Sequence, residues 1–318
     1  MRTILFWSKK PNNTWFGKAT PGERYFRKCP LSCELTRNRS RIEEASLVVF
    51  SSSDSKPEWP EVRFENQTYI HFLNERPGPW HEWLQRYEGK INLTWNYRRD
   101  ADISQHAIVR KLNEPINYTI SVPLSSRNRS VVWVVSHCKA SSQRDVYAHE
   151  LAKHIDVDIY GYCGFLKCSR DLRQECLTMF RDTYKFYLSF ENRICKDYIT
   201  EKFFHPLHNE LIPVVLGGGD YKSLSPPHSY IDVKDYKSPK ELADYLHHLE
   251  QNEDEYNAYF DWIKNYYFES TNDDRTCILC NIAHNSSWAR PAHTDYYNWW
   301  FSGCDDSLVD DMRTSGNW

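Results

Sequence analysis

The chain has 318 residues and a formal net charge of −3, a length sufficient for two domains at about 100 to 200 residues each. Its Lys and Arg residues form no block, which argues against an extended basic face for nucleic acid or anionic membranes. Aromatic residues make up 15% of the chain, and this abundance favours a cleft for a flat or sugar-like ligand.

The first third of the chain contains short apolar runs separated by polar, proline-containing loops. These runs lie at 3–7, 46–50 and 68–73 and are typical of strands in an α/β lobe. The first run is too short for the apolar core of a signal peptide, and no segment approaches the about 18 apolar residues of a membrane span. We therefore expect any membrane anchor to lie outside this sequence.

A polar passage at 113–130 contains two prolines and is the candidate linker between two lobes. After it, the strand-like run VVWVVS (131–136) is followed by a polar loop, a helical pattern from Asp145 and a second strand at 157–161. This order predicts a βαβ unit.

A second βαβ unit is predicted from the strand-like run YKFYLSF (184–190), a helix that starts near Tyr198 and the strand LIPVVLGG (211–218). In a parallel sheet, both strand-to-helix loops leave the carboxyl edge, where ligands bind and helix N-termini point their N–H groups outward. We therefore expect the two polar loops to converge on one site.

Two further helices are predicted from capping and periodicity. Ser238 to Glu241 form a capping box with proline at the first helical position, and a second amphipathic pattern runs from about 254 to 268. After this point the sequence becomes irregular and Trp-rich, with CILC at 277–280 and YYNWW at 296–300.

The polar loop of the second βαβ unit admits two interpretations. In the structural one, Asp197 or Thr200 caps the helix and the other side chains are solvated. In the functional one, the helix N-terminus and Lys202 meet the diphosphate of a nucleotide sugar, and Glu201 accepts hydrogen bonds from ribose hydroxyls. Arg144, at the corresponding turn of the first unit, would add a second cation.

Metal and dinucleotide motifs are weak in this sequence. Two D-x-D triplets occur, at 100–102 and 156–158, but the second lies within an alternating strand pattern, and we do not expect a catalytic metal site. Gly217, Gly218 and Gly219 follow a strand without the G-x-G-x-x-G spacing, which disfavours a nicotinamide enzyme.

Ten cysteines and seven Asn-x-Ser/Thr sequons indicate an oxidising, glycosylating compartment. The pairs at 29/33 and 277/280 have the spacing of a zinc site, although the sequons favour disulfides. Cys163, Cys168 and Cys176 are close enough to pair locally, and Cys195 is either free or bridged. The glycosylation candidates are Asn12, Asn38, Asn66, Asn92, Asn117, Asn128 and Asn285.

The motif F-E-N-x-x-x-x-D-Y-I-T-E-K, followed by I-P-V-V-L-G, resembles the signature of the α1,3-fucosyltransferases of glycosyltransferase family 10. The segment CKDYITEKFF and the ending CILCNIAH…YYNWWFSGC are most similar to the invertebrate N-glycan enzymes of that family. Four further stretches resemble the family in the same order, at 33–50, 73–80, 92–103 and 131–164.

The resemblance implies an α/β fold of GT-B type, with two Rossmann-like lobes, a cleft between them and a C-terminal tail that folds back on the N-terminal lobe. We expect an acceptor lobe at 1–126, a GDP-fucose lobe at 127–268 and a Cys/Trp-rich tail at 269–318. The resemblance further implies that four cysteines staple the N-terminal lobe to the tail, namely Cys29, Cys33, Cys277 and Cys280.

Carried over position by position, the resemblance implies that Arg144 and Lys202 bind the GDP phosphates, that Glu201 binds the ribose, and that Asn192 and Tyr198 bind the donor. Fucose would leave with inversion through an oxocarbenium-like transition state. Two fixed cations can stabilise the GDP leaving group where a metal otherwise would, so no metal is expected to be obligatory and Mn²⁺ would at most stimulate.

Glu75 matches the acidic residue that the family uses as general base toward the acceptor hydroxyl. Without the family, it would be read as an exposed loop carboxylate, and Arg76 stands where the family motif usually has Ser. Tyr97, Arg98 and Asp100 match a family segment that we expect to shape the cleft.

The implied reaction moves fucose from GDP-fucose to a GlcNAc of N-glycans on glycoproteins. The invertebrate resemblance favours the core GlcNAc linked to Asn, with an antennal N-acetyllactosamine or LacdiNAc unit as the alternative. The family implies the Golgi lumen and a type II membrane protein. The rival interpretation is a protein that binds GDP-sugar or glycan without turnover.

Overall fold

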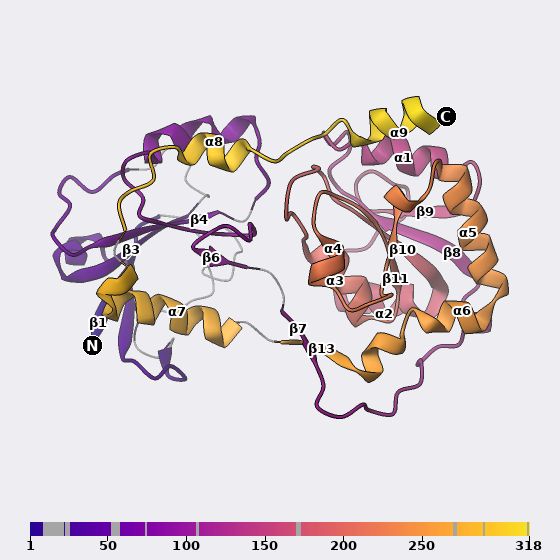
Figure 1. The fold of residues 1–318 in the computed structure, drawn as a ribbon, viewed down its shortest axis with the longest axis horizontal. Helices are drawn as coiled ribbons and strands as arrows, with labels where there is room; N and C mark the ends of the chain where they lie inside the picture. The colour runs from indigo at the N-terminus through magenta and orange to yellow at the C-terminus, as the bar shows by residue number, and fades with distance from the viewer. Residues whose placement is uncertain are drawn as a thin grey trace. The chain divides into compact units, whose positions relative to one another are not determined.

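A computed structural model describes most of the chain and divides it into two compact units (Figure 1). Unit 1 comprises residues 1–108 and 269–302, and unit 2 comprises residues 109–268 and 303–318. The described residues are 1–8, 22, 26–51, 58–73, 75–105, 108–169, 173–269, 272–288, 290–316 and 318.

Unit 1 is built on a six-stranded parallel sheet in the order β2-β1-β3-β4-β5-β6. Its three predicted strands are confirmed, because each apolar run is buried in this sheet. Two 3-10 helices connect strands, η3 (Arg39–Glu44) and η4 (Pro79–Tyr87). The strands are β1 (Arg2–Phe6), β2 (Cys33–Thr36), β3 (Ala45–Ser51), β4 (Thr68–Leu73), β5 (Leu93–Asn96) and β6 (Ile103–Ser104).

The chain returns to unit 1 after residue 268 as helices, so the irregular structure expected for this part of the tail is wrong. Helix α7 (Asn272–His284) packs on β1 and β3 and adds Leu279 and Ile282 to their core. A 3-10 turn, η9 (Ser286–Trp288), and helix α8 (Tyr296–Phe301) complete the segment.

Unit 2 contains a five-stranded parallel sheet in the order β12-β11-β10-β8-β9. Both predicted βαβ units are confirmed in it. The strands are β8 (Arg129–Val134), β9 (Val157–Tyr160), β10 (Tyr184–Phe190), β11 (Ile212–Leu216) and β12 (Ile231–Asp232). The helices are α1 (Arg144–Leu151), α2 (Arg173–Thr183), α3 (Glu201–His208), α4 (Tyr221–Leu224), α5 (Pro239–Gln251), α6 (Glu253–Ala258) and α9 (Leu308–Gly316).

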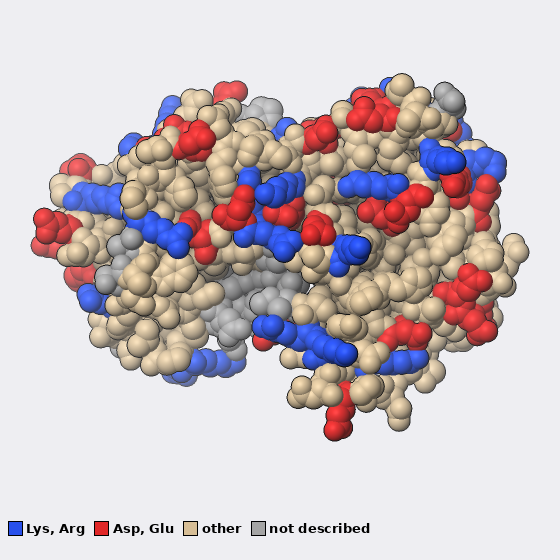
Figure 2. Space-filling model, viewed as in Figure 1, with Lys and Arg blue, Asp and Glu red and all other residues tan. Residues whose placement is uncertain are grey.

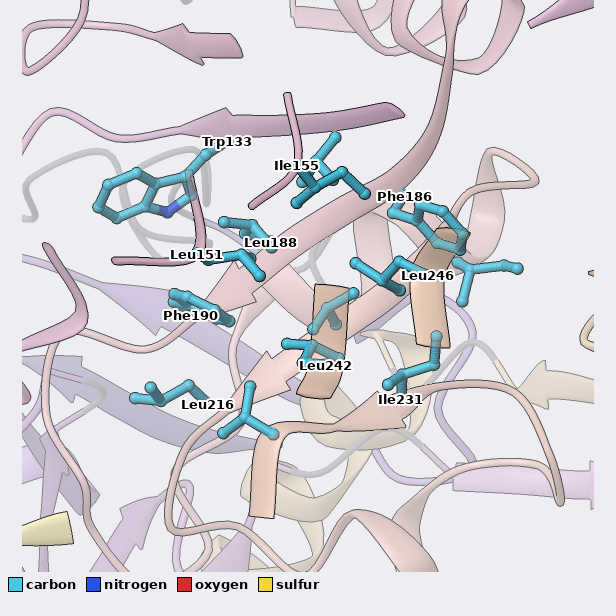
Figure 3. Close-up of a cluster of buried hydrophobic side chains, with 14 of the residues drawn as sticks. Trp133, Leu151, Ile155, Phe186, Leu188, Phe190, Leu216, Ile231, Leu242 and Leu246 are labelled. Atoms are coloured by element: carbon cyan, nitrogen blue, oxygen red, sulfur yellow. The ribbon is translucent and has the colours of Figure 1, made fainter. Parts of the chain in front are cut away.

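Successive strand residues of the unit 2 sheet point to opposite sides. Helices cover both faces and bury these side chains. Trp133, Leu188 and Leu216 pack with Leu151 of α1 and Leu242 of α5 in one cluster (Figure 3). On the other face, Val132 and Tyr187 meet α2, and Val215 meets α3. Short 3-10 helices lie in the connections, η5 (Leu124–Ser126), η7 (Val233–Asp235) and η8 (Asp261–Lys264).

The single helix predicted at 254–268 is wrong. The segment forms α6, then η8, then β13 (Tyr266–Glu269), which pairs with β7 (Ile108–Lys111) in a separate two-stranded sheet. Phe260 is buried in the cluster with α1 and α5, whereas Trp262 is buried in the cluster with α3. Helix α6 ends at Ala258, before both residues, and the chain continues as the 3-10 turn that carries Trp262.

Charged residues of both signs are interspersed over the face drawn in Figure 2, which shows no large basic patch. Within the described part of the chain, no helix has the length and apolar character that would be needed to cross a membrane.

Candidate active site

The strand order of unit 2 places a topological switch point between β8 and β10. These strands are neighbours in the sheet, and their connections lead to opposite sides of it, an arrangement that opens a ligand crevice at the carboxyl ends. A cavity of about 270 Å³ lies there. Its lining comes from β8 and β10, from α1, α2 and α3, and from the loops that follow the strands. The lining residues are Val134, Val135, Ser136, His137, Arg144, Gly161, Cys168, Ser169, Arg173, Cys176, Leu177, Phe180, Tyr187, Asn192, Glu201, Lys202 and His205.

Four residues predicted to bind the donor line this cavity, namely Arg144, Asn192, Glu201 and Lys202. They come from α1, from the loop after β10 and from the start of α3. Tyr198 is buried, at 4% exposure, and is not among the lining residues. The expected convergence of the two polar loops is therefore confirmed.

Helix α3 begins at the cavity because Thr200 caps it. The Thr200 hydroxyl accepts a hydrogen bond from the backbone N–H of Lys202, and the Thr200 backbone is extended, as an N-cap requires. Asp197, the other candidate cap, has a φ of 64° in the preceding turn. The cap places the side chains of Glu201 and Lys202 in the first turn of the helix, where they line the cavity.

The Arg144 guanidinium is held by main-chain carbonyls. It is buried, at 4% exposure, and donates to the carbonyl oxygen of Phe190 at 2.7 Å and to that of His137 at 3.0 Å. These carbonyls belong to the end of β10 and to the loop after β8. The backbone at the switch point thus fixes a cation that cannot lose its charge.

The Lys202 ammonium lies between carboxylates. It is 2.9 Å from Glu191 Oε2 and 3.6 Å from Glu201 Oε1. Burial disfavours the charged ammonium, but both carboxylates outweigh burial and raise the pKa of Lys202 above its ordinary value. Lys202 is therefore a permanent cation at neutral pH.

Asn192 presents a buried acceptor to the cavity. Its Oδ1 is buried, and no hydrogen-bond donor among the described residues reaches it. A buried polar atom without a partner is uncommon in native proteins and needs an explanation. A hydroxyl or N–H of a ligand in the cavity would supply one.

The lining includes three titratable residues that were not predicted from the sequence, namely His137, Arg173 and His205. Arg173 is the first residue of α2, the helix that contains Cys176. Burial lowers the pKa of His205, although Glu201 opposes this effect, so His205 is neutral at pH 7. Leu177, Phe180 and Tyr187 are also missed residues, and they form an apolar side of the cavity.

The loop after β10 is tied to the C-terminal segment. Cys195 is paired with Cys304, and the flanking backbone forms hydrogen bonds from Lys196 N–H to the Gly303 carbonyl oxygen (2.6 Å) and from Asp305 N–H to that of Ile194 (2.8 Å). The loop after β10, which we call the cavity loop, is thus covalently linked to the C-terminal segment.

Two further disulfides flank the cavity in unit 2. Cys138, next to His137, pairs with Cys163, and Cys168 pairs with Cys176, both of which line the cavity. In unit 1, Cys29 pairs with Cys277 and Cys33 with Cys280.

The glycines after β11 serve close packing. A Cβ on Gly218 would lie only 2.5 to 2.7 Å from backbone atoms of Cys195, and a Cβ on Gly219 would lie 2.2 Å from the Ile199 side chain. The Gly-rich run therefore lets the loop after β11 lie against the cavity loop.

In unit 1, Glu75 follows β4 at the carboxyl end of the sheet and is exposed, and the neighbouring Arg76 is buried. Arg98 makes two hydrogen bonds of 2.8 Å with Asp100 and stacks on Trp299, with its guanidinium carbon 4.3 Å from the ring centroid. These contacts tie the segment after β5 to α8.

One carboxylate of each D-x-D triplet is paired with an arginine. Asp102 pairs with Arg290 at 2.6 Å, and Asp158 pairs with Arg129 at 2.6 Å. Among the described residues, one Cys/His group brings its ligand atoms within metal-binding reach, Cys33, Cys280 and His284. Its two sulfurs are joined in a disulfide, so they are not thiolate ligands.

Five of the sequon asparagines are exposed, namely Asn38, Asn66, Asn117, Asn128 and Asn285. Asn92 is half-buried, and its Nδ2 donates to the carbonyl oxygen of Arg290 at 2.7 Å. Asn12 lies outside the described residues.

Two family profiles match the chain. The one described as "Fucosyltransferase, N-terminal" covers residues 1–106, and the one described as "Glycosyltransferase family 10 (fucosyltransferase) C-term" covers residues 124–299.

Three relatives share about a third of their residues with this chain. Glycoprotein 3-alpha-L-fucosyltransferase A of Drosophila melanogaster is 36% identical, over 94% of this chain and 60% of that protein. Alpha-(1,3)-fucosyltransferase C of Drosophila melanogaster is 34% identical, over 95% of this chain and 78% of that protein. Alpha-(1,3)-fucosyltransferase fut-1 of Caenorhabditis elegans is 32% identical, over 89% of this chain and 68% of that protein. The chain thus spans 60% of the length of the first of these relatives.

Two solved structures share the fold. A crystal structure of α1,3-fucosyltransferase with GDP-fucose has a TM-score of 0.58 at 15% identity and covers 89% of this chain and 90% of that one. A crystal structure of α1,3-fucosyltransferase with GDP has a TM-score of 0.53 at 14% identity and covers 92% of each chain. Together with the two parallel α/β units, these matches confirm the predicted GT-B fold class.

Proposed function

The chain belongs to glycosyltransferase family 10, the fucosyltransferase family, and from this premise we propose that it transfers fucose from GDP-fucose to a GlcNAc of N-glycans in an α1,3 linkage. One observation carries the proposal: the cavity at the switch point of unit 2 brings together Arg144, Lys202 and the buried Oδ1 of Asn192. Two cations beside an unpartnered acceptor suit a diphosphate that carries a sugar.

The donor binds in this cavity. Arg144 and Lys202 contact the diphosphate, Glu201 accepts hydrogen bonds from the ribose, and Asn192 Oδ1 accepts one from a donor hydroxyl or N–H. Tyr198 was expected to bind the donor, but its side chain is buried and does not line the cavity, so we expect it to support the loop after β10 instead. The apolar side of the cavity at Phe180 suits the face of the base.

The cations also act on the leaving group. Negative charge develops on the β-phosphate as the bond to fucose breaks, and a fixed guanidinium and a fixed ammonium stabilise that charge without reorganisation. The reaction inverts the fucose anomeric centre and needs no metal; Mn²⁺ at most stimulates it. Full activity in EDTA is expected.

Glu75 is proposed as the base that takes the proton of the acceptor hydroxyl. It is an exposed carboxylate that follows a central strand of unit 1 at the carboxyl end, as a base that must meet a large substrate requires. Glu75→Gln should abolish turnover and leave GDP binding intact. Unchanged turnover in this variant would remove Glu75 from the mechanism.

The acceptor is a glycoprotein N-glycan, and the core GlcNAc linked to Asn is favoured over an antennal unit. The 36% identity to a glycoprotein 3-alpha-L-fucosyltransferase supports a glycoprotein acceptor. The exposed sequons and the disulfides support a Golgi-lumenal location.

The test is mass spectrometry of the products formed from GDP-fucose and a panel of defined N-glycans with either core or antennal GlcNAc free. We expect one deoxyhexose on the core GlcNAc. If fucose appeared on antennal GlcNAc alone, the proposed core acceptor would be wrong, although the proposed transfer reaction would stand. If UDP-sugars or GDP-mannose were preferred in competition, GDP-fucose would not be the donor.

The rival function is a binding protein without turnover, favoured by Arg76, which stands where the family motif usually has Ser. If purified protein bound GDP-fucose but formed no product with any acceptor of the panel, the binding function would replace the enzymatic one.

A further inference from the structure

Glu191 is a carboxylate with 0% exposure that directly follows β10. Its Oε1 accepts hydrogen bonds from the backbone N–H of Thr200 (2.9 Å) and from the Thr200 hydroxyl (2.7 Å). Its Oε2 accepts from the Lys202 ammonium at 2.9 Å. A buried ionised carboxylate is stable only when it is paired and hydrogen-bonded, and these three contacts meet that condition.

The same contacts determine where the Lys202 ammonium lies. An ammonium has three N–H donors; one reaches Glu191, and a second reaches the Thr200 hydroxyl at 2.7 Å. One donor remains for Glu201, whose nearer oxygen is 3.6 Å away, or for a ligand in the cavity. Without these partners, the flexible four-carbon stem of a lysine would leave the charge unplaced.

Glu191 also connects this charge to the helix that carries it. Thr200 caps α3. The Glu191 carboxylate therefore binds both the residue at the start of the helix and the Lys202 ammonium. If two different side chains bound Thr200 and Lys202, the Lys202 ammonium could shift relative to the start of α3.

We propose that Glu191 is a positioning residue for the donor phosphates, which acts by holding the Lys202 ammonium in place at the cavity. The inference rests on the proposed role of Lys202 in the function above. Glu191 is fully buried and does not line the cavity, so it would contact neither donor nor acceptor.

A pH effect follows from the charges that face the ammonium. Burial and Arg144 of α1 lower the pKa of Lys202, whereas Glu191 and Glu201 raise it, and the carboxylates prevail. His205 of α3 faces the same group of charges. Lysine is charged below its pKa, and loss of the Glu191 charge should lower the pKa of Lys202. As the pH rises, the Lys202 ammonium should therefore lose its proton at a lower pH than in the unsubstituted chain.

The experiment compares the purified full chain with Glu191→Gln, Lys202→Met and the double variant, using kcat/KM for GDP-fucose from about pH 6 to 11, a range that extends above the ordinary pKa of lysine. Glu191→Gln should lower kcat/KM by about 10²-fold, the effect of a misplaced charge of this kind, and should move the alkaline limb to lower pH. In the Lys202→Met background, Glu191→Gln should cost little more, because the two residues act through one group.

Glu250→Gln is the matched control. It removes the carboxylate of another mostly buried pair in unit 2, 3.1 Å from Lys185, and neither residue lines the cavity. Its kcat/KM and alkaline limb should match those of the unsubstituted chain. Melting temperatures of all variants separate loss of fold from loss of positioning.

The proposal is overturned if Glu191→Gln is folded and its kcat/KM is normal, if its alkaline limb does not move, or if its effect is equally large with and without Lys202. Should Glu191→Gln not fold, Glu191→Asp replaces it, since one methylene less draws the carboxylate away from the ammonium; an unchanged profile in that variant also overturns the proposal. Normal turnover of Lys202→Met would instead refute the role of Lys202 in the proposed function.

Discussion

Arg144 and Lys202 reach the same cavity by different means. Main-chain carbonyls hold the guanidinium, so its position follows from the fold of the switch point. Side chains hold the ammonium, so its position depends on Glu191 and Thr200. Substitutions of the surrounding side chains should therefore affect Lys202 more than Arg144.

Removal of either cation should slow transfer. We expect Arg144→Ala and Lys202→Met each to reduce kcat by at least about 10²-fold, because each removes a fixed charge from the leaving group. The measurement is GDP release with a saturating N-glycan acceptor, and Lys185→Met, outside the cavity, is the control. Near-normal rates in either cavity variant would refute its assignment.

Asp102 is expected to stabilise unit 1. Burial raises the pKa of its carboxyl, but hydrogen bonds from His293 and Thr94 outweigh burial, and the net effect is a lowered pKa. A carboxyl with a lowered folded-state pKa contributes stability above its unfolded pKa of about 3.9, and this stability is lost as the pH falls through the folded value.

Asp102→Asn should therefore lower the free energy of unfolding by about 1 to 3 kcal/mol at pH 7, with a smaller difference below about pH 4. Denaturant unfolding at both pH values measures it. If Asp102→Asn were as stable as the unsubstituted chain at pH 7, and if Mn²⁺ restored activity that the variant had lost, the result would instead support a metal role for the first D-x-D triplet.

At the scale of single residues, a motif predicted which side chains would lie together. Asn192, Glu201 and Lys202 are close in sequence and line one cavity. Arg173 and His205 line it too, but their positions depend on how α2 packs and which side of α3 is buried, and no local pattern encodes either.

Elements were predictable where an apolar run is buried on both faces. The runs at 68–73 and 184–190 coincide with β4 and β10, which are central strands of parallel sheets. The pattern at 254–268 has aromatic residues at helical spacing, of which Tyr256, Tyr259 and Phe260 are buried in one cluster, whereas Tyr267 is exposed in β13. Periodicity alone does not show where a helix ends and another element begins.

The glycine run after β11 offers a test at this scale. Gly218→Ala would place a Cβ against the backbone of Cys195, and the stapled loop cannot move away easily. We expect a loss of about 1 to 3 kcal/mol in stability together with weaker GDP binding, measured by thermal unfolding and calorimetry. Unchanged GDP affinity would show that the loop tolerates displacement.

At the scale of the whole molecule, unit 1 is assembled from two stretches that are far apart in the sequence, 1–108 and 269–302. Helix α7 packs on β1, which is more than 260 residues away in the chain, and two disulfides join Cys29 to Cys277 and Cys33 to Cys280. Sequence spacing alone left zinc and disulfides open here, because neither pairing nor long-range packing can be derived from it.

The long-range staples should contribute more stability than a local one. Replacing all four of these cysteines by Ser should cost about 5 kcal/mol, against about 2 to 3 kcal/mol for Cys168→Ser with Cys176→Ser, because loop-closure entropy grows with the length of the closed loop. Melting temperatures of the two variants compare them. An equal or larger loss from the short pair would show that loop length does not determine how much these disulfides stabilise the protein.

The central claim is that the cavity of unit 2 is the GDP-fucose site, and calorimetric titration tests it most directly. GDP-fucose and GDP should bind more tightly than UDP-sugars, and Lys202→Met should weaken GDP-fucose binding at least about tenfold, whereas Lys185→Met should leave it unchanged. Equal affinity for UDP-sugars, or full affinity in the Lys202→Met variant, would contradict the claim.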